Sequence, residues 1–148
     1  FSPDDQLQVK AVRRMLSDLR LQTDLTKPAF VVDLIGKDMA VEVTSDAGKI
    51  TTKSDSLNQV SRFIQQERKQ EKVILVANTY SRLPLEERVG KENFSREVKG
   101  FLEKLEVCCL SARCLYLLWK KAQEKSMPPE NSKNLIFNTV GELAEDEI

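Results

Sequence analysis

Apolar residues recur along the chain with two different spacings, and together these spacings predict helices that alternate with short strands. Apolar positions three and four apart predict helices that begin near Ser2, Ser54 and Ser95, and a fourth helix towards the end of the chain. Residues 73–77 and 107–110 are instead continuously apolar, which is typical of strands covered by helices on both sides. The pattern therefore predicts an α/β fold in which helices flank a central sheet.

Residues 28–44 predict a β-hairpin that gathers acidic side chains on one face. Gly36 would supply the positive φ of a type II′ turn between Ile35 and Asp38, and apolar residues flank this turn on both sides. Because side chains alternate along a strand, the register that follows from this turn places four pairs on one face. These pairs are Ile35 with Asp38, Asp33 with Ala40, Val31 with Glu42, and Ala29 with Thr44.

In this register Asp33 and Glu42 are diagonal neighbours, and such neighbours have Cα atoms roughly 7 to 8 Å apart. Two carboxylates at that separation can close around one divalent ion. Two solvated acids on the exposed face of a hairpin would explain the same pattern. The hairpin alone therefore leaves both interpretations open.

Composition narrows the chemistry that this chain can perform. It contains no histidine, and its three cysteines, Cys108, Cys109 and Cys114, lie in apolar segments without a Cys-x-x-Cys spacing, as in a reducing compartment. A structural zinc site, a Ser-His-Asp triad and a Cys-His pair are therefore excluded within this sequence. Its five glycines form neither a G-x-G-x-x-G motif nor a P-loop. With 23 basic and 23 acidic residues, the chain also lacks the net positive charge of a strong non-specific DNA binder.

The order of the predicted elements, which is helix, hairpin, helix, strand, helix, strand and helix, resembles the restriction-endonuclease-like, or PD-(D/E)xK, superfamily over nearly the whole chain. Members of that family place an acid after a proline on the first hairpin strand and a (D/E)-x-K motif on the second, where they bind a divalent metal and activate water. Residues 42–44, Glu-Val-Thr, correspond to the second motif, and residues 45–50 are similar to the loop that follows it. Gln59 lies where many members carry a glutamine beside the active site. Residues 73–78 and 82–88 resemble a strand and a loop of bacterial and archaeal members.

Two positions depart from the family pattern. Ala29 follows the proline where the pattern has an acid, and Thr44 holds the position of the lysine. A methyl group cannot ligate a cation, and a hydroxyl carries no charge to orient water or to stabilise a transition state. Four explanations stay open: Asp33 replaces the acid, Lys49 or Lys53 replaces the lysine, the copy is catalytically inactive, or the alanine is an engineered change.

The resemblance implies a site for Mg²⁺ or Mn²⁺ that is made by Asp33 and Glu42 and completed by the carbonyl of Val43. The implied catalytic positions are Glu42, Asp33, Ala29, Thr44 and Lys49. The residues expected to contact a nucleic acid backbone are Lys49, Lys53, Gln59, Tyr80 and Arg82, the last two in the long irregular segment 78–94. We therefore expect a metal-dependent nuclease-fold domain that acts on or binds DNA. The alternative is an inactive nuclease-like domain that binds nucleic acid or docks a protein partner.

The length of 148 residues suits one restriction-endonuclease-like domain over residues 1–126, with a C-terminal extension over 127–148 that ends in an acidic tail. No apolar run approaches the ~20 residues of a membrane-spanning helix, and the N-terminus lacks the basic start of a signal peptide. We therefore expect no membrane contact, and we expect an intracellular protein that is cytoplasmic or nuclear. Because the chain opens at Phe1, we expect it to be part of a longer protein. The expected partners are DNA or RNA, together with other domains of that protein or a second copy of this chain.

Overall fold

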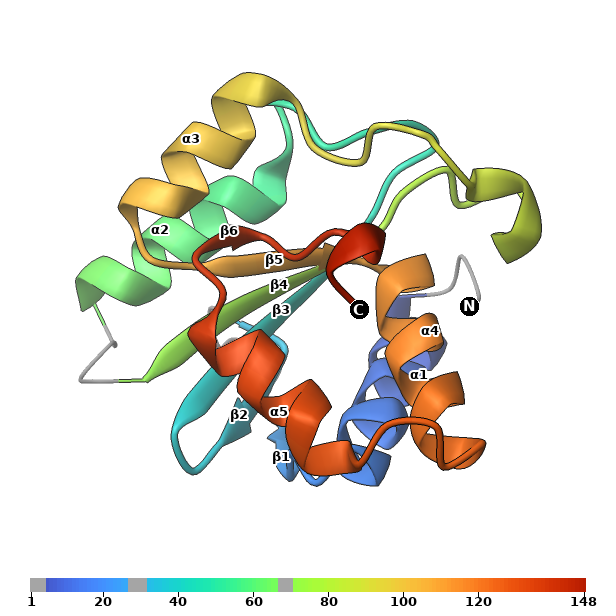
Figure 1. The fold of residues 1–148 in the computed structure, drawn as a ribbon. Helices are drawn as coiled ribbons and strands as arrows, with labels where there is room; N and C mark the ends of the chain where they lie inside the picture. The colour runs from blue at the N-terminus through green and yellow to red at the C-terminus, as the bar shows by residue number, and fades with distance from the viewer. Residues whose placement is uncertain (1–4, 27–31, 67–70) are drawn as a thin grey trace.

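A computed structural model describes residues 5–26, 32–66 and 71–148 and shows a single mixed sheet in which six strands follow one another in chain order (Figure 1). The first three strands pair antiparallel, and from the third strand onwards the pairing is parallel. The strands are β1 (Thr23–Leu25), β2 (Leu34–Gly36), β3 (Met39–Ser45), β4 (Lys72–Asn78), β5 (Cys108–Ser111) and β6 (Gly141–Glu142).

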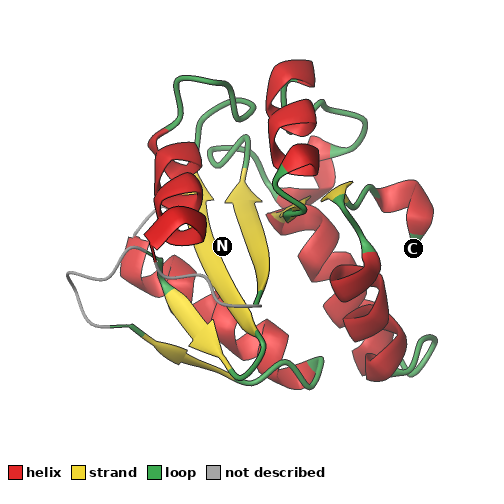
Figure 2. Ribbon diagram, turned by 90° about the vertical axis from the view of Figure 1, so that its left-hand side faces the viewer, coloured by secondary structure: helices red, strands yellow, loops and turns green. Residues whose placement is uncertain are grey.

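Helices cover both faces of this sheet, which gives three layers (Figures 1 and 2). One face is covered by α2 (Asp55–Gln66) and α3 (Arg96–Lys104), and the other by α1 (Asp5–Asp18) and α4 (Ala112–Gln123), with α5 (Pro129–Asn138) packed beside α4. Two short 3₁₀ turns complete the described elements, η1 (Leu85–Arg88) and η2 (Glu145–Glu147). The predicted three-layer α/β arrangement with a mixed sheet is therefore confirmed at this level.

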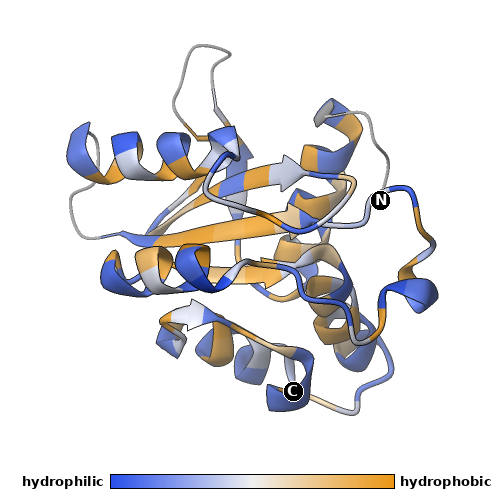
Figure 3. Cartoon of the chain, turned by 90° about the horizontal axis from the view of Figure 1, so that it is seen from above, coloured by the Kyte–Doolittle hydropathy of each residue, from blue (hydrophilic) through white to orange (hydrophobic). Residues whose placement is uncertain are grey.

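Alternating side chains of the central strands supply two apolar cores, one on each face of the sheet. Val41 and Val43 of β3 point towards α1 and α4, whereas Ala40 points towards α2. The strand next to it is buried on both faces, as the unbroken apolar run 73–77 predicts. Figure 3 shows this apolar centre from above, with hydrophilic residues on the outer sides of the helices. Each large apolar side chain that is fully buried in this way contributes roughly 1.5 to 3 kcal/mol of transfer free energy.

Serine residues fix the starts of two helices at the ends of the sheet. The hydroxyl of Ser95 accepts a hydrogen bond from the backbone N–H of Val98 at the start of α3. The hydroxyl of Ser111 accepts one from the N–H of Cys114 at the start of α4, at 3.0 Å. Such caps satisfy N–H groups that the first helical turn leaves unpaired. The helix starts predicted near Ser54 and Ser95 are confirmed, whereas the cap predicted at Ser2 lies outside the described residues.

The predicted hairpin forms between β2 and β3, but the predicted turn and register are wrong. Leu34 pairs with Val41, and Ile35 pairs with Ala40 instead of Asp38, so the register is shifted by two residues. The predicted partners Val31 and Ala29 lie outside the described residues. Because a shift of two residues preserves the alternation of side chains, Ile35 still shares the α2 face with Ala40.

Gly36 explains why the sequence misled the prediction of the turn. It pairs with Thr23 of β1 inside the sheet, and it is not among the glycines of positive φ. A Cβ atom at this position would lie 2.6 Å from the carbonyl oxygen of Gln22 and 2.8 Å from Cγ of Met39. The glycine is therefore required by close packing instead of by turn geometry.

The end of the chain joins the sheet instead of forming only a solvated acidic tail. β6 pairs in parallel with β5, and Leu143, directly after it, is fully buried in the core beneath α4. The acidic turn η2 follows this anchor and buries none of its own residues. Among the described residues, no helix is long and apolar enough to cross a membrane.

Candidate metal site and the loops beside it

Two carboxylates face each other across β2 and β3. Asp33 directly precedes Leu34, the first paired residue of β2, and its carboxylate interacts with the carboxyl group of Glu42 on β3. The backbone N–H of Asp33 donates to the carbonyl of Val41 at 3.1 Å, and the N–H of Val43 donates to Oδ2 of Asp33 at 2.8 Å. Backbone groups on both sides of Glu42 therefore hold Asp33 in place.

Glu42 is buried, with 8% of its surface exposed. Burial removes water from its carboxyl group, and this loss, together with the nearby charge of Asp33, raises the pKa of Glu42 to about 10. In the described part of the chain, no lysine or arginine forms an ion pair with either acid. Without a bound cation the pair therefore holds a proton at neutral pH, because two adjacent carboxylates resist ionising together.

Further oxygen atoms near the acid pair come from the backbone of β3 and from side chains of α2. The N–H and the carbonyl of one strand residue point towards the same neighbouring strand, so the carbonyl of Val43 points towards the β2 edge of β3, where its N–H meets Asp33. On α2, which packs against β3, the side-chain oxygens Oγ of Ser56 and Oε1 of Gln59 are buried and have no hydrogen-bond partner among the described residues. Buried polar atoms without partners are rare in folded proteins and indicate a place for water or an ion. No group of three or more His, Cys, Asp or Glu suited to a metal occurs among the described residues.

The structure does not bring the candidate lysines to the acid pair. Nζ of Lys49 lies 3.6 Å from a carboxylate oxygen of Glu92 in a half-exposed ion pair, and Lys53 is exposed. Thr44 pairs with Ala77 in the β3–β4 ladder and is half-buried. Ala29 lies outside the described residues. The catalytic roles expected of these positions stay predictions.

The loop that follows β3 runs beside the long loop that follows β4. Ile50 donates to the carbonyl of Asn93 at 2.8 Å and accepts from the N–H of Ser95 at 2.9 Å. Tyr80 is fixed within this pair of loops, because its hydroxyl donates to the carbonyl of Glu92 at 2.6 Å. Arg82, by contrast, is exposed and free to approach a ligand.

A buried polar chain fastens the long loop to the sheet, and the sequence analysis did not predict it. Nη1 of Arg88 donates to Oδ1 of Asn78 at 2.6 Å, and Nδ2 of Asn78 donates to Oε1 of Gln8 at 2.8 Å. Arg88 is only 5% exposed, and burial lowers the pKa of its guanidinium. The position of Asn78, directly after an apolar strand, is a usable signal for a site at a sheet edge. Nothing in the sequence distinguishes Arg88 from the exposed Arg82.

Comparisons with known proteins give no further guide to this site. A scan against protein-family models, a search of curated proteins and a search of solved structures each found no match to this chain.

Proposed function

We propose that this chain is a nuclease-type domain with a restriction-endonuclease-like fold, in which Asp33 and Glu42 hold Mg²⁺ or Mn²⁺ against the phosphate backbone of DNA or RNA. The observation that carries this proposal is the contact between the two acids at the start of the β2–β3 pairing, where Glu42 is buried beside Asp33. The hydrogen bond from the N–H of Val43 to Asp33 supports it, since this bond fixes one carboxylate beside the other.

The chemistry of the available donors fits a hard divalent cation. Asp33 and Glu42 offer carboxylate oxygens, and the carbonyl of Val43 points towards the same strand edge as the N–H that meets Asp33. Gln59 adds a buried amide oxygen that has no partner among the described residues. Magnesium is commonly bound through one or two carboxylates and keeps several waters, so a full cage of acids is not required. A cation would also offset the loss of hydration and the repulsion from Asp33 that together keep Glu42 protonated. When bound, such an ion supplies an activated water and stabilises charge on a phosphate.

A second candidate function is metal-assisted binding of nucleic acid without cleavage. Two observations favour it over catalysis. Thr44 occupies the position where the related family carries lysine, and Lys49 is engaged by Glu92 at 3.6 Å instead of by the acid pair. No cation from the described residues therefore accompanies the carboxylates, and stabilising the charge of a phosphoryl transition state normally requires one.

Cleavage of labelled single- and double-stranded DNA and RNA in Mn²⁺ or Mg²⁺ separates these functions. The chain as written is compared with Glu42→Gln, with Ala29→Asp and with Glu124→Gln, a control that removes an exposed carboxylate of α4. Cleavage that Glu42→Gln abolishes and Glu124→Gln preserves supports the catalytic form. Cleavage only by Ala29→Asp supports a disabled site.

A binding experiment completes the test. If no variant cleaves, metal-dependent retention of labelled nucleic acid that is lost in Glu42→Gln supports the binding function. The absence of both cleavage and metal-dependent binding, in chains that are folded by circular dichroism, would refute both candidates.

A further inference from the structure

A pocket separate from the acid pair lies at the carboxyl ends of β5 and β6. Its volume is about 280 Å³, and it is bounded by the loop after η1, by the start of α4 and by the segment that follows β6. In open α/β sheets, ligands bind in the crevice outside the carboxyl ends of parallel strands. Its position alone makes this pocket the natural place to look for a further ligand.

Three basic residues from different parts of the fold line the pocket. They are Arg88 of η1, Lys91 of the following loop and Arg113 in the first turn of α4. Arg88 is buried, and its hydrogen bonds to other described residues go to neutral oxygens, including the carbonyl of Leu83 at 2.9 Å. No carboxylate of the described residues forms an ion pair with this guanidinium. A buried cation without a counter-ion is costly, so the site favours an anion nearby.

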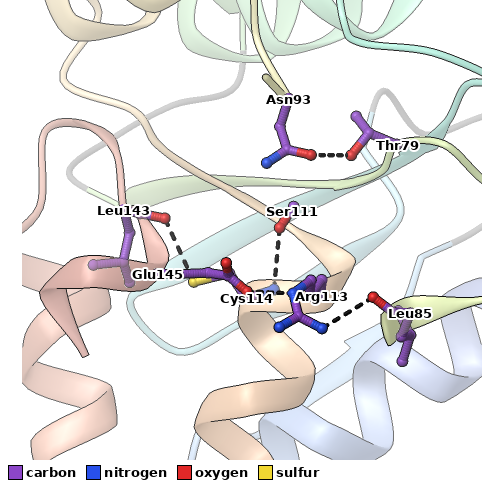
Figure 4. Close-up of polar contacts among 8 residues, drawn as sticks. All are labelled: Thr79, Leu85, Asn93, Ser111, Arg113, Cys114, Leu143 and Glu145. Atoms are coloured by element: carbon purple, nitrogen blue, oxygen red, sulfur yellow. Dashed lines mark hydrogen bonds and ion pairs between the residues drawn. The ribbon is translucent and has the colours of Figure 1, made fainter. Parts of the chain in front are cut away.

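The chain itself already places a carboxylate in this pocket. Figure 4 shows Arg113 between the carbonyl of Leu85, to which Nη1 donates at 2.9 Å, and the carboxylate of Glu145, with which Nε forms an ion pair. Glu142 and Asp146 line the same wall, so all the acids of the pocket come from the C-terminal segment. The cations, by contrast, come from η1, its loop and α4.

The acidic wall is anchored to the core at Leu143. Leu143 is fully buried and its carbonyl accepts a weak hydrogen bond from Sγ of Cys114 at 3.5 Å, which anchors the segment (Figure 4). The turn beyond this anchor has no buried residue, and Ile148, directly after it, makes only a partly buried contact with the apolar core. If the carboxylate of Glu145 moved away, the guanidinium of Arg113 could contact a ligand in the pocket.

We propose that this pocket binds a phosphate group, and that Glu145 occupies it as an internal competitor which the phosphate displaces. Guanidinium groups match the oxygens of phosphate in a fork geometry, and a phosphate carries more charge than the carboxylate it replaces. The start of α4, where Ser111 caps the helix, adds the positive end of the helix dipole. This site shares no residue with the acid pair and does not depend on the proposed metal.

Free phosphate compounds and the terminal phosphate of a nucleic acid strand present the same chemistry to these side chains. The pocket volume of about 280 Å³ accommodates one such group. The two sources are therefore separated by experiment, with inorganic phosphate as one probe and a short single strand with a 5′-phosphate or a 5′-hydroxyl as the other.

Titration of the ¹⁵N-labelled chain with inorganic phosphate, in EDTA and at constant ionic strength, tests the proposal through the amide signals of Gly90, Ser111 and Arg113. Glu145→Gln removes the competitor, and we expect it to raise the affinity roughly two- to fivefold, the range measured for ion pairs of this kind. Lys91→Gln removes an exposed cation and should lower the affinity by a similar factor. Arg113→Gln should lower it about tenfold or more, because charge-assisted bonds to phosphate are strong.

Glu124→Gln is the matched control, because it removes a carboxylate of α4 whose partner Lys120 lies outside the pocket. A gain in Glu124→Gln equal to that in Glu145→Gln would show a general charge effect and overturn the proposal. So would the lack of a saturable shift in both the parent chain and Glu145→Gln, or an unchanged affinity in a folded Lys91→Gln variant. Preference for the 5′-phosphorylated strand over the 5′-hydroxyl strand would support the site with a nucleic acid end as its source. Equal binding of the two strands, with saturable binding of inorganic phosphate, would support the site with a free phosphate compound as its source.

Discussion

Replacement of Glu42 by glutamine is expected to stabilise the metal-free domain, although it removes a buried side chain of the proposed site. The pKa of Glu42 rises from 4.5 to about 10 on folding, first through loss of water and then through the charge of Asp33. The folded chain therefore keeps a proton that the unfolded chain releases above pH 4.5, and stability falls as pH rises through this window. The fall amounts to about 1.4 kcal/mol per pH unit, so over the roughly 2.5 units up to pH 7 it reaches about 3 kcal/mol.

Glutamine has nearly the same shape and does not titrate, so Glu42→Gln should recover up to about 3 kcal/mol at pH 7 and almost nothing near pH 4. Urea unfolding in EDTA, followed by circular dichroism at several pH values from 4 to 8, measures the difference. Glu124→Gln, whose carboxylate is exposed and 3.8 Å from Lys120, should change stability by less than about 0.5 kcal/mol with no comparable pH trend. The reasoning is refuted if Glu42→Gln is less stable than the parent at pH 7, or if the difference between them does not grow with pH.

Three further substitutions test the packing around the sheet. Gly36→Ala should lower the free energy of unfolding in urea by about 2 kcal/mol or more, because a Cβ atom would lie 2.6 Å from a backbone oxygen. Gly100→Ala, where a Cβ atom meets open space on α3, should instead raise it by about 0.5 to 1 kcal/mol. Equal effects of the two would contradict the close packing. Arg88→Met leaves the side-chain oxygen of Asn78 and the carbonyl of Leu83 without their donor. We expect it to lower the free energy of unfolding by about 2 to 4 kcal/mol and to speed hydrogen exchange in the loop over 79–95. Arg82→Met, at an exposed position, should change little. Unchanged stability in Arg88→Met would show that the buried chain does not hold the loop. Ser111→Ala should cost about 1 kcal/mol through loss of the α4 cap, and a thermal melt identical to the parent would argue against that cap.

The sequence predicts the layers of this fold better than its details, because apolar spacing reports burial over many residues. The unbroken run 73–77 identified a strand buried on both sides, and helical spacing located α2 and α3. The sequence did not predict β1, because its three residues, two of them polar, are too few to show the alternation of apolar and polar residues that is typical of a strand. β6 is two residues long and is defined by its pairing with β5 across the chain, which no local pattern encodes.

The candidate site shows the same division between local and distant information. Alternation along the hairpin placed Asp33 and Glu42 on one face, and this conclusion survives a register error of two residues because the side-chain period is two. The register itself depended on Gly36, whose role is set by contacts with Gln22 and Met39 that only the folded sheet creates. The pocket around Arg113 unites η1, α4 and the C-terminal turn, so its residues could not be grouped from the sequence.

The central claim is that Asp33 and Glu42 hold a divalent cation, and a calorimetric titration with Mn²⁺ near pH 7 tests it most directly. Repeating the titration in two buffers of different ionisation enthalpy counts the protons released on binding. We predict one saturable site per chain and release of about one proton, because the ion displaces the proton that the buried pair holds. Binding should disappear in Glu42→Gln and in Asp33→Asn, and it should persist in Glu124→Gln. No saturable binding by a folded chain, or equal binding in Glu42→Gln, would contradict the account.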